Sequence, residues 1–228
     1  KTLLTNDGTI TLEFPHLLQL IQHRQFDTVY HEHYSYLSLT AVKTIFEYNG
    51  LTVFDVEQLP THGGSLRVFA QRSDTVPYAV SSIVAQLIAE ECAYGLTDSA
   101  VYSAFQSQAE QVKNDLLSFL LEAKQKGQTV AAYGAAAKGN TLLNFAGVRP
   151  DLLAYVVDRN PAKQGQYMPG SRIPIVDEQR LKDDRPDYIL LLPWNLKTEL
   201  AAQLNYVAKW GGKLVVAVPS LQQVKQED

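Results

Sequence analysis

The chain has 228 residues, of which 46 % are apolar and 19 % are charged, and its formal net charge is −4. The apolar content excludes a disordered chain, because enough side chains are present to form a core. The acidic balance is the wrong sign for a general nucleic-acid binder, and no apolar run reaches the roughly 18 residues that a membrane helix needs. We therefore expect neither nucleic acid nor a membrane as a partner.

Cysteine and histidine are used unevenly. Cys92 is the single cysteine, so no internal disulfide can form, and we predict a buried thiol and a cytoplasmic protein. All five histidines lie within the first 62 residues, which places proton transfer near neutral pH in that part of the chain. The sequence opens on Lys1 without an initiator Met or a signal peptide, so we expect a piece of a longer protein.

The first 72 residues mix strand and helix signals. Alternating apolar positions, β-branched residues and turn residues predict three strands, and Thr40 is a candidate N-cap for a helix. The predicted elements are strands over 9–14, 51–56 and 65–70, a helix over 40–47, and a loop over 60–64.

Helical spacing of apolar residues then runs from Val80 to Lys126, with a packing face that includes Val112, Leu116 and Leu120. After Gly127, continuous apolar strands alternate with helices, which is typical of a parallel sheet covered on both faces. The predicted strands are 129–133, 153–157, 188–192 and 213–218, with one helix that ends at Phe145 and another over 197–210. This half is predicted to be Rossmann-like.

A small-residue loop, 134–140, connects the first of these strands to its helix. Such a loop lets the backbone approach a phosphate, and the N–H groups of a helix N-terminus bind anions. Its Gly-x-Ala-x-x-Gly spacing is a variant of the dinucleotide-binding fingerprint, and Asp158 stands where a ribose ligand is expected. Tight strand–helix packing is the alternative, against which the charge of Lys138 argues. The candidate binding residues are Gly134, Lys138, Gly139, Asn140 and Asp158.

A dense group of proton donors and acceptors occupies residues 30–36. In an extended segment His31 and His33 share one face, while Tyr30, Glu32 and Tyr34 share the other. An imidazole there could act as a base while a carboxylate or phenol orients a partner or binds an oxyanion. A zinc site completed by a further ligand and a surface segment rich in aromatics are the alternatives.

The stretch His62-Gly63-Gly64-Ser65-Leu66-Arg67 is a weaker feature. Its glycines offer backbone N–H groups to a carbonyl oxygen or a phosphate, whereas a plain hairpin turn explains them equally well.

Residues 13–15, 26–36, 62–67, 133–140 and 158–161 together resemble the S-adenosylmethionine-dependent sugar C-methyltransferases that act on nucleoside-diphosphate keto sugars. The resemblance implies a protein of three parts: a small zinc-binding N-terminal part, a central methyl-donor domain and a C-terminal Rossmann-like domain for the nucleotide sugar.

The resemblance also implies the fold class and the domains of this chain. We expect an α/β fold in which residues 1–72 are the tail of the α/β methyl-donor domain and carry the His-Glu-His segment. Residues 73–228 are expected to be a helical lead-in followed by a Rossmann-like parallel sheet with flanking helices. The donor site and the zinc ligands would then lie upstream of Lys1, so this chain is not expected to methylate by itself.

By the same resemblance, the reaction is methyl transfer to a ring carbon next to a ketone through an enolate made by a base. His33 is expected to be the base, Glu32 and Tyr30 to orient groups or stabilise the enolate, and His31 to support them. The 134–140 loop would hold the diphosphate.

Ser65 and Arg67 are expected to reach the sugar or a phosphate of the nucleoside-diphosphate sugar. Two other functions stay open. The spacing of Gly134 and Asp158 would also suit an NAD(P)-dependent oxidoreductase, and a module that binds a nucleotide sugar without catalysis would carry the same residues.

Overall fold

A computed structural model describes residues 1–75 and 77–225 of the chain. The chain forms two compact units. The first unit comprises Lys1–Gln25 and His33–Gln106, and the second unit comprises Phe26–Glu32 and the residues from Ser107 onward. The predicted division at residue 72 into a donor-domain tail and a sugar-binding part stays a prediction.

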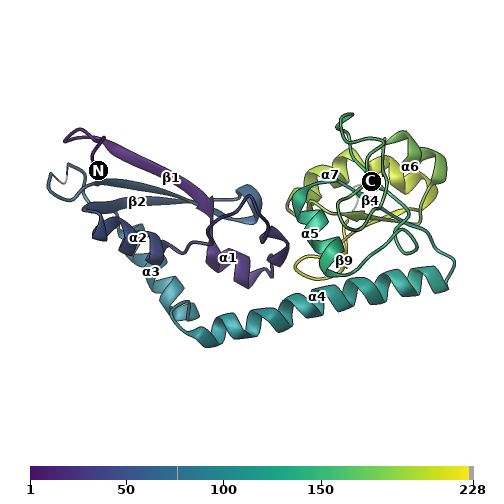
Figure 1. Cartoon of the computed structure of the whole chain (residues 1–228), viewed down its shortest axis with the longest axis horizontal. Coiled ribbons are helices and arrows are strands. Elements are labelled where there is room, and N and C mark those ends of the chain that lie inside the picture. Colours follow the sequence, from purple (N-terminus) through teal and green to yellow (C-terminus); the bar gives the residue numbers. More distant parts are fainter. Residues whose placement is uncertain (76, 226–228) are drawn as a thin grey trace. The chain divides into compact units, whose positions relative to one another are not determined.

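The first unit is built on a three-stranded sheet of β1 (Thr9–Pro15), β2 (Leu51–Leu59) and β3 (Ser65–Arg72) (Figure 1). The strand order is β1-β3-β2, and the central β3 is antiparallel to both neighbours. All three strands were predicted at these places, and each runs to within three residues of its predicted end. Pro15 and Leu59 both pair with Ser65, so one end of β1 and the β2–β3 connection share the same edge of the sheet.

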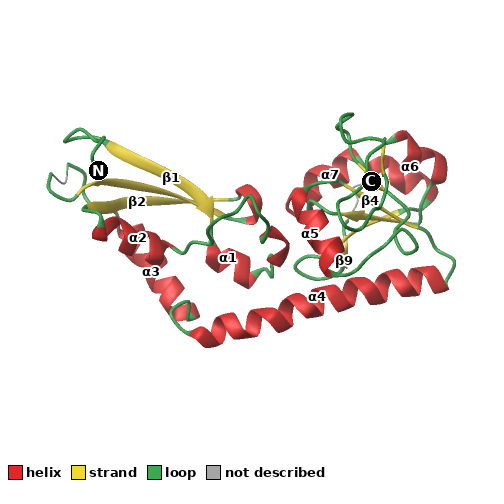
Figure 2. Ribbon diagram, in the orientation of Figure 1, coloured by secondary structure: helices red, strands yellow, loops and turns green. Residues whose placement is uncertain are grey.

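Three helices accompany this sheet: α1 (Leu17–Gln22), α2 (Leu39–Tyr48) and α3 (Ser82–Tyr94). Helices α2 and α3 pack against β2 (Figure 2), and their apolar faces close a core with Leu66 and Val68 of β3. The N-cap of α2 is Ser38, whose Oγ accepts from the Ala41 N–H at 3.1 Å, and not Thr40 as predicted. Thr40 instead donates its hydroxyl to Glu91, so its side chain is not available as a cap.

The prediction of a buried thiol at Cys92 is wrong, because the side chain is exposed. On α3 the inward face carries Val84, Leu87 and Glu91 at helical spacing, which turns the next position outward. The interior group is the Glu91 carboxylate, which accepts from the backbone N–H of Leu39 at 2.7 Å and of Thr40 at 2.8 Å.

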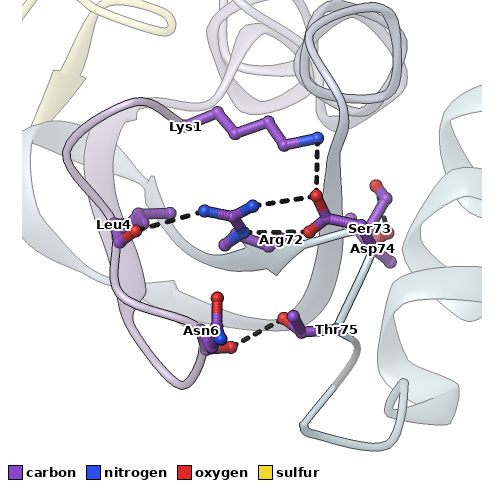
Figure 3. Close-up of polar contacts among 8 residues, drawn as sticks. Lys1, Leu4, Asn6, Arg72, Ser73, Asp74 and Thr75 are labelled. Carbon is purple, nitrogen blue, oxygen red and sulfur yellow. Dashed lines mark hydrogen bonds and ion pairs between the residues drawn. The ribbon is translucent and has the colours of Figure 1, made fainter.

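The start of the chain is tied to the end of β3, as Figure 3 shows. Asp74 binds the Lys1 ammonium at 3.1 Å and the Arg72 guanidinium at 2.9 Å. Arg72 also donates to the Leu4 carbonyl, and the Thr75 hydroxyl donates to the Asn6 carbonyl at 2.6 Å. The two cations hold the pKa of the Asp74 carboxyl well below its usual range, which keeps the carboxyl ionised for both pairs.

The second unit contains a six-stranded sheet in the order β6-β5-β4-β7-β8-β9, parallel except for the antiparallel β9. The chain leaves β4 toward one side, through β5 and β6, and then returns to build β7 and β8 on the other. This reversal makes the carboxyl end of β4 a topological switch point, where open α/β sheets bind ligands. The strands are β4 (Val130–Tyr133), β5 (Val156–Val157), β6 (Ile175–Val176), β7 (Tyr188–Leu191), β8 (Lys213–Val216) and β9 (Gln222–Gln223).

Helices α5 (Ala137–Phe145), α6 (Gln179–Asp184) and α7 (Lys197–Gln203) flank this sheet. The long α4 (Ser99–Gln125) buries the predicted face, including Val112, Leu116 and Leu120. The predicted α/β fold with a Rossmann-like sheet is therefore confirmed. None of the helices in residues 1–75 and 77–225 is long and apolar enough to cross a membrane.

Some elements differ from the sequence prediction. The predicted strand over 153–157 pairs only at Val156 and Val157, and the predicted helix over 197–210 continues past α7 as a 3-10 helix, Asn205–Trp210. The two-residue strands β6 and β9 were not predicted, because two residues are too short to show a period.

Candidate functional site

A cavity of about 400 Å³ lies in the second unit, beside the loop that follows β4. Its wall includes residues from stretches that are far apart in sequence, namely Tyr30 and His31, the loop with the start of α5, residues between 162 and 169, and Ile175. Among the residues that line it are Tyr30, His31, Asn140, Lys163, Tyr167 and Met168. The cavity therefore gathers part of the His-Glu-His segment and part of the small-residue loop in one unit.

The two glycines of the loop permit close packing. A Cβ on Gly134 would lie 2.5 Å from the Pro193 Cγ, and Gly134 has a φ of 94°, which disfavours other residues. A Cβ on Gly139 would lie 2.7 Å from the Leu192 Cβ. The packing explanation considered for these glycines thus has direct geometric support, and their predicted contact with substrate stays a prediction.

Asp158 is hydrogen-bonded to the loop that follows β4. Its Oδ2 accepts from the Ala135 N–H at 2.8 Å and from the Lys163 Nζ at 3.1 Å, while its Oδ1 accepts from the Asn160 N–H at 2.8 Å. Asp158, the residue predicted to bind a ribose, is therefore hydrogen-bonded to protein groups. Its role toward substrate stays a prediction.

Lys163 is a cation that sequence reasoning missed. Its Nζ also donates to the Ala135 carbonyl at 2.8 Å, and the side chain lines the cavity. A lysine in the loop that follows the second parallel strand was the available signal, since that loop meets the β4 loop at the same edge of the sheet.

Lys138 is almost fully buried, at 9 % exposure, and is not among the residues that line the cavity. Its Nζ donates to the Asn195 Oδ1 at 3.1 Å and lies 4.4 Å from the centre of the Trp194 ring. Burial lowers the pKa of Lys138, and the nearby Asp27 works in the opposite direction. Asn140 does line the cavity, and its buried Oδ1 has no partner among the described residues.

The 26–32 segment is held on α5. Residues Phe26–Thr28 form a 3-10 helix against α5, where the rings of Phe26 and Phe145 lie 5.1 Å apart. Asp27 is fully buried, and its Oδ2 accepts from the Trp194 Nε1 at 2.7 Å. Burial raises the pKa of Asp27 to about 6, although the Trp194 bond and the Lys138 charge act against the rise.

The four predicted catalytic residues are placed differently. Tyr30, half-buried, and His31, exposed, line the cavity. Glu32 is exposed, and a turn at His31–Glu32 replaces the extended segment on which the face alternation was argued. His33 is half-buried and belongs to the first unit. Their catalytic roles stay predictions.

Ser65 and Arg67 also belong to the first unit. The buried Ser65 hydroxyl donates to the Thr61 carbonyl at 3.1 Å. Arg67 forms ion pairs with Glu13 at 2.9 Å and with Glu57 at 3.2 Å. Both side chains are thus engaged within the unit, and their predicted contact with substrate stays a prediction.

The described part of the chain contains no group of three or more His, Cys, Asp or Glu side chains that could hold a metal ion. The alternative of a zinc site built around His31 and His33 therefore has no ligand set among these residues. Zinc in an upstream part stays a prediction.

A mostly parallel sheet with its cavity at the switch point, next to a glycine-bearing loop that opens a helix, defines an α/β protein with a Rossmann-like sheet. Residues 60–219 match the family described as "C-methyltransferase C-terminal domain". The chain is also 36 % identical to the C-methyltransferase NovU of Streptomyces niveus over 227 residues, which cover 100 % of this chain and 54 % of that protein. The chain belongs to the C-methyltransferase C-terminal domain family, and it spans about half the length of the curated relative that it matches.

Proposed function

We propose that this chain is the substrate-binding part of an S-adenosylmethionine-dependent sugar C-methyltransferase, and that its cavity binds a nucleoside-diphosphate keto sugar. The supporting observation is the composition of the cavity wall. Tyr30 and His31 line the same cavity as Asn140 and the first residues of α5, so a sugar nucleotide held there would meet both an anion-binding helix N-terminus and proton-transfer groups.

The cavity offers complementary chemistry for such a ligand. The N-terminus of α5 supplies positive potential for a diphosphate, and the Lys163 ammonium, which is paired with Asp158 at 3.1 Å, supplies a charged donor on the same wall. Tyr167 and Met168 supply apolar surface for a sugar or a base.

In the proposed reaction a base removes the proton from the ring carbon next to the ketone, and a donor stabilises the enolate oxygen. His33 is our candidate base, since a neutral imidazole is well matched to proton abstraction near pH 7. Tyr30 is the candidate enolate donor, and His31 and Glu32 support the pair. In a complete enzyme S-adenosylmethionine supplies the methyl group that the carbon takes up.

We assign no residue of this chain to binding that methyl donor. Gly63 and Gly64 lie in the connection between the antiparallel β2 and β3 and not in a strand–loop–helix turn.

The oxidoreductase alternative is less well supported than methyl transfer. The family match names C-methyltransferases, and the Asp158 carboxylate, which would bind a dinucleotide ribose, is bonded to Ala135 and Lys163. A non-catalytic sugar-nucleotide module differs from our proposal only by the reaction.

Calorimetric titration of the 228-residue chain tests the binding proposal. We expect TDP-glucose to bind more tightly than NADH, and Lys163→Ala to weaken TDP-glucose binding about tenfold or more because a charge-assisted contact is lost. Lys209→Ala is the matched control, since Lys209 is an exposed lysine of the 3-10 helix Asn205–Trp210 and does not line the cavity. Tighter binding of NADH, or equal effects of the two lysine substitutions, would contradict the proposal.

A further inference from the structure

A fully buried carboxyl group stands at the start of the segment that carries Tyr30 and His31. Asp27 has 0 % exposure, although carboxylates are rarely buried without a compensating partner. Its neighbour Phe26 already provides apolar packing against Phe145 of α5. An acid at this position therefore needs another explanation than filling space.

The explanation offered by the geometry is a directional bond. The Asp27 Oδ2 accepts from the Trp194 indole N–H at 2.7 Å, and Trp194 begins the 3-10 helix Trp194–Leu196 in the connection from β7 to α7. Lys138 of α5 lies on the same indole ring and adds its charge near the carboxylate. Two parts of the second unit, α5 and the β7–α7 connection, thus both lie near the Asp27 side chain.

The 26–32 segment is buried only at its start, where Phe26, Asp27 and Thr28 lie. It is seven residues long, and the chain on both sides of it belongs to the first unit. Val29, Glu32 and His31 are exposed. A hydrogen bond fixes both distance and direction, whereas ring packing such as that of Phe26 tolerates sliding.

We propose that Asp27 is a positioning residue that holds Tyr30 and His31 at the cavity through its bond to Trp194. The effect of this residue on catalysis rests on the proposed function. The claim that Asp27 anchors the 26–32 segment, which we call the mechanical claim, rests only on the contacts of the second unit. Asp27 lies three residues before Tyr30, so a shift of the anchor is passed directly to both cavity residues.

Hydrogen–deuterium exchange of the 228-residue chain tests the mechanical claim. Asp27→Ala removes the acceptor and Trp194→Phe removes the donor, and each should speed amide exchange in residues 26–32 at least fivefold. The double variant should exchange no faster than the faster single variant, because both changes break the same bond. Asp27→Asn keeps an acceptor oxygen and should stay within twofold of the parent chain.

The matched control is Trp210→Phe. Trp210 is the other tryptophan of the chain, and its Nε1 donates to the Pro186 carbonyl at 3.1 Å, away from this segment. This variant should leave exchange in residues 26–32 unchanged. Equal acceleration in Trp210→Phe, or exchange in Asp27→Ala equal to that of the parent, would overturn the proposal. Melting curves recorded for each variant identify any variant that unfolds. If Asp27→Ala unfolds, the exchange result of Trp194→Phe decides.

Turnover of a full-length methyltransferase that carries this chain gives the functional readout. We expect kcat to fall at least tenfold in Asp27→Ala and to be restored to within threefold in Asp27→Asn. A kcat in Asp27→Asn as low as in Asp27→Ala would contradict a positioning role through Trp194. If the parent chain fails to bind TDP-glucose, the proposed function fails, while the exchange data still decide whether Asp27 holds the segment.

Discussion

Two buried acids in this chain are treated in opposite ways by their surroundings. Burial alone would raise the pKa of Glu91, but the bonds it accepts from His16, Thr40 and Leu39 hold that pKa below its usual value. Asp27 accepts a side-chain hydrogen bond from Trp194, and its Oδ1 has no hydrogen-bond partner among the described residues, so burial dominates its pKa. Glu91 is therefore a satisfied cap, whereas Asp27 is held in place at a cost in stability.

That cost predicts how stability depends on pH. The pKa of Asp27 is raised from 3.8 to about 6, so the folded chain binds this proton more tightly than the unfolded chain does. The Asp27 contribution to the free energy of unfolding is therefore largest below about pH 4, falls as pH rises to about 6, and is constant above that. Asp27→Asn should remove this fall, so its stability relative to the parent should rise across the window.

Urea unfolding followed by circular dichroism at about pH 4.5 and about pH 7 measures the difference. The matched control is Asp151→Asn, a change of an exposed acid on the same unit. A stability difference between Asp27→Asn and the parent that stays constant over this range would contradict the assignment.

Two glycines beside the cavity, Gly134 and Gly139, let the backbone pack closely against Pro193 and Leu192. Gly139 lies inside α5, where helix propensity favours alanine by up to about 1 kcal/mol. The Cβ of an alanine there would, however, meet the Leu192 Cβ at 2.7 Å. Packing between α5 and the end of β7 thus opposes propensity.

We expect Gly139→Ala to destabilise the chain by about 1–3 kcal/mol, as overpacked core positions do. Gly147→Ala is the control, because Gly147 has a φ of 68° with no atom within 4 Å of an added Cβ and reports backbone strain alone. Chemical denaturation of both variants measures the two effects. A stabilised Gly139→Ala would show that α5 can move away from Leu192 without loss.

Across the whole chain, the boundary between the two units passes through the predicted catalytic segment. Tyr30, His31 and Glu32 belong to the second unit, which contains the cavity, and His33 belongs to the first. The cavity that we propose to bind substrate thus belongs to the second unit, and the candidate base belongs to the first.

This division predicts separable effects in a full-length methyltransferase that carries this chain. His33→Ala should reduce turnover at least tenfold through loss of the base, while affinity for TDP-glucose changes little because the cavity is intact. His23→Ala, which alters an exposed histidine at the end of α1, should change neither. Full turnover in His33→Ala would remove His33 from the role.

Much of this architecture was accessible from local sequence pattern. The continuous apolar runs of β4, β7 and β8 and the glycine-bearing turn before α5 predicted a Rossmann-like sheet and a small-residue loop between a strand and a helix. These features depend on residues close together in the chain, whose period and turn chemistry are set locally. The same holds for β1, β2 and β3.

Pairings between distant residues depended on the tertiary structure. No local pattern shows that Lys138 turns onto Trp194, that Lys163 takes a place in the cavity wall, or that Asp27 binds an indole 167 positions away. The helical period places position 91 on the inward face of α3, but it does not show that the Glu91 carboxylate would accept from the N–H groups of Leu39 and Thr40 in α2. The sequence determined the elements and the kind of chemistry they carry, and folding determined which charged groups face the cavity, since burial and pairing depend on neighbours from other elements.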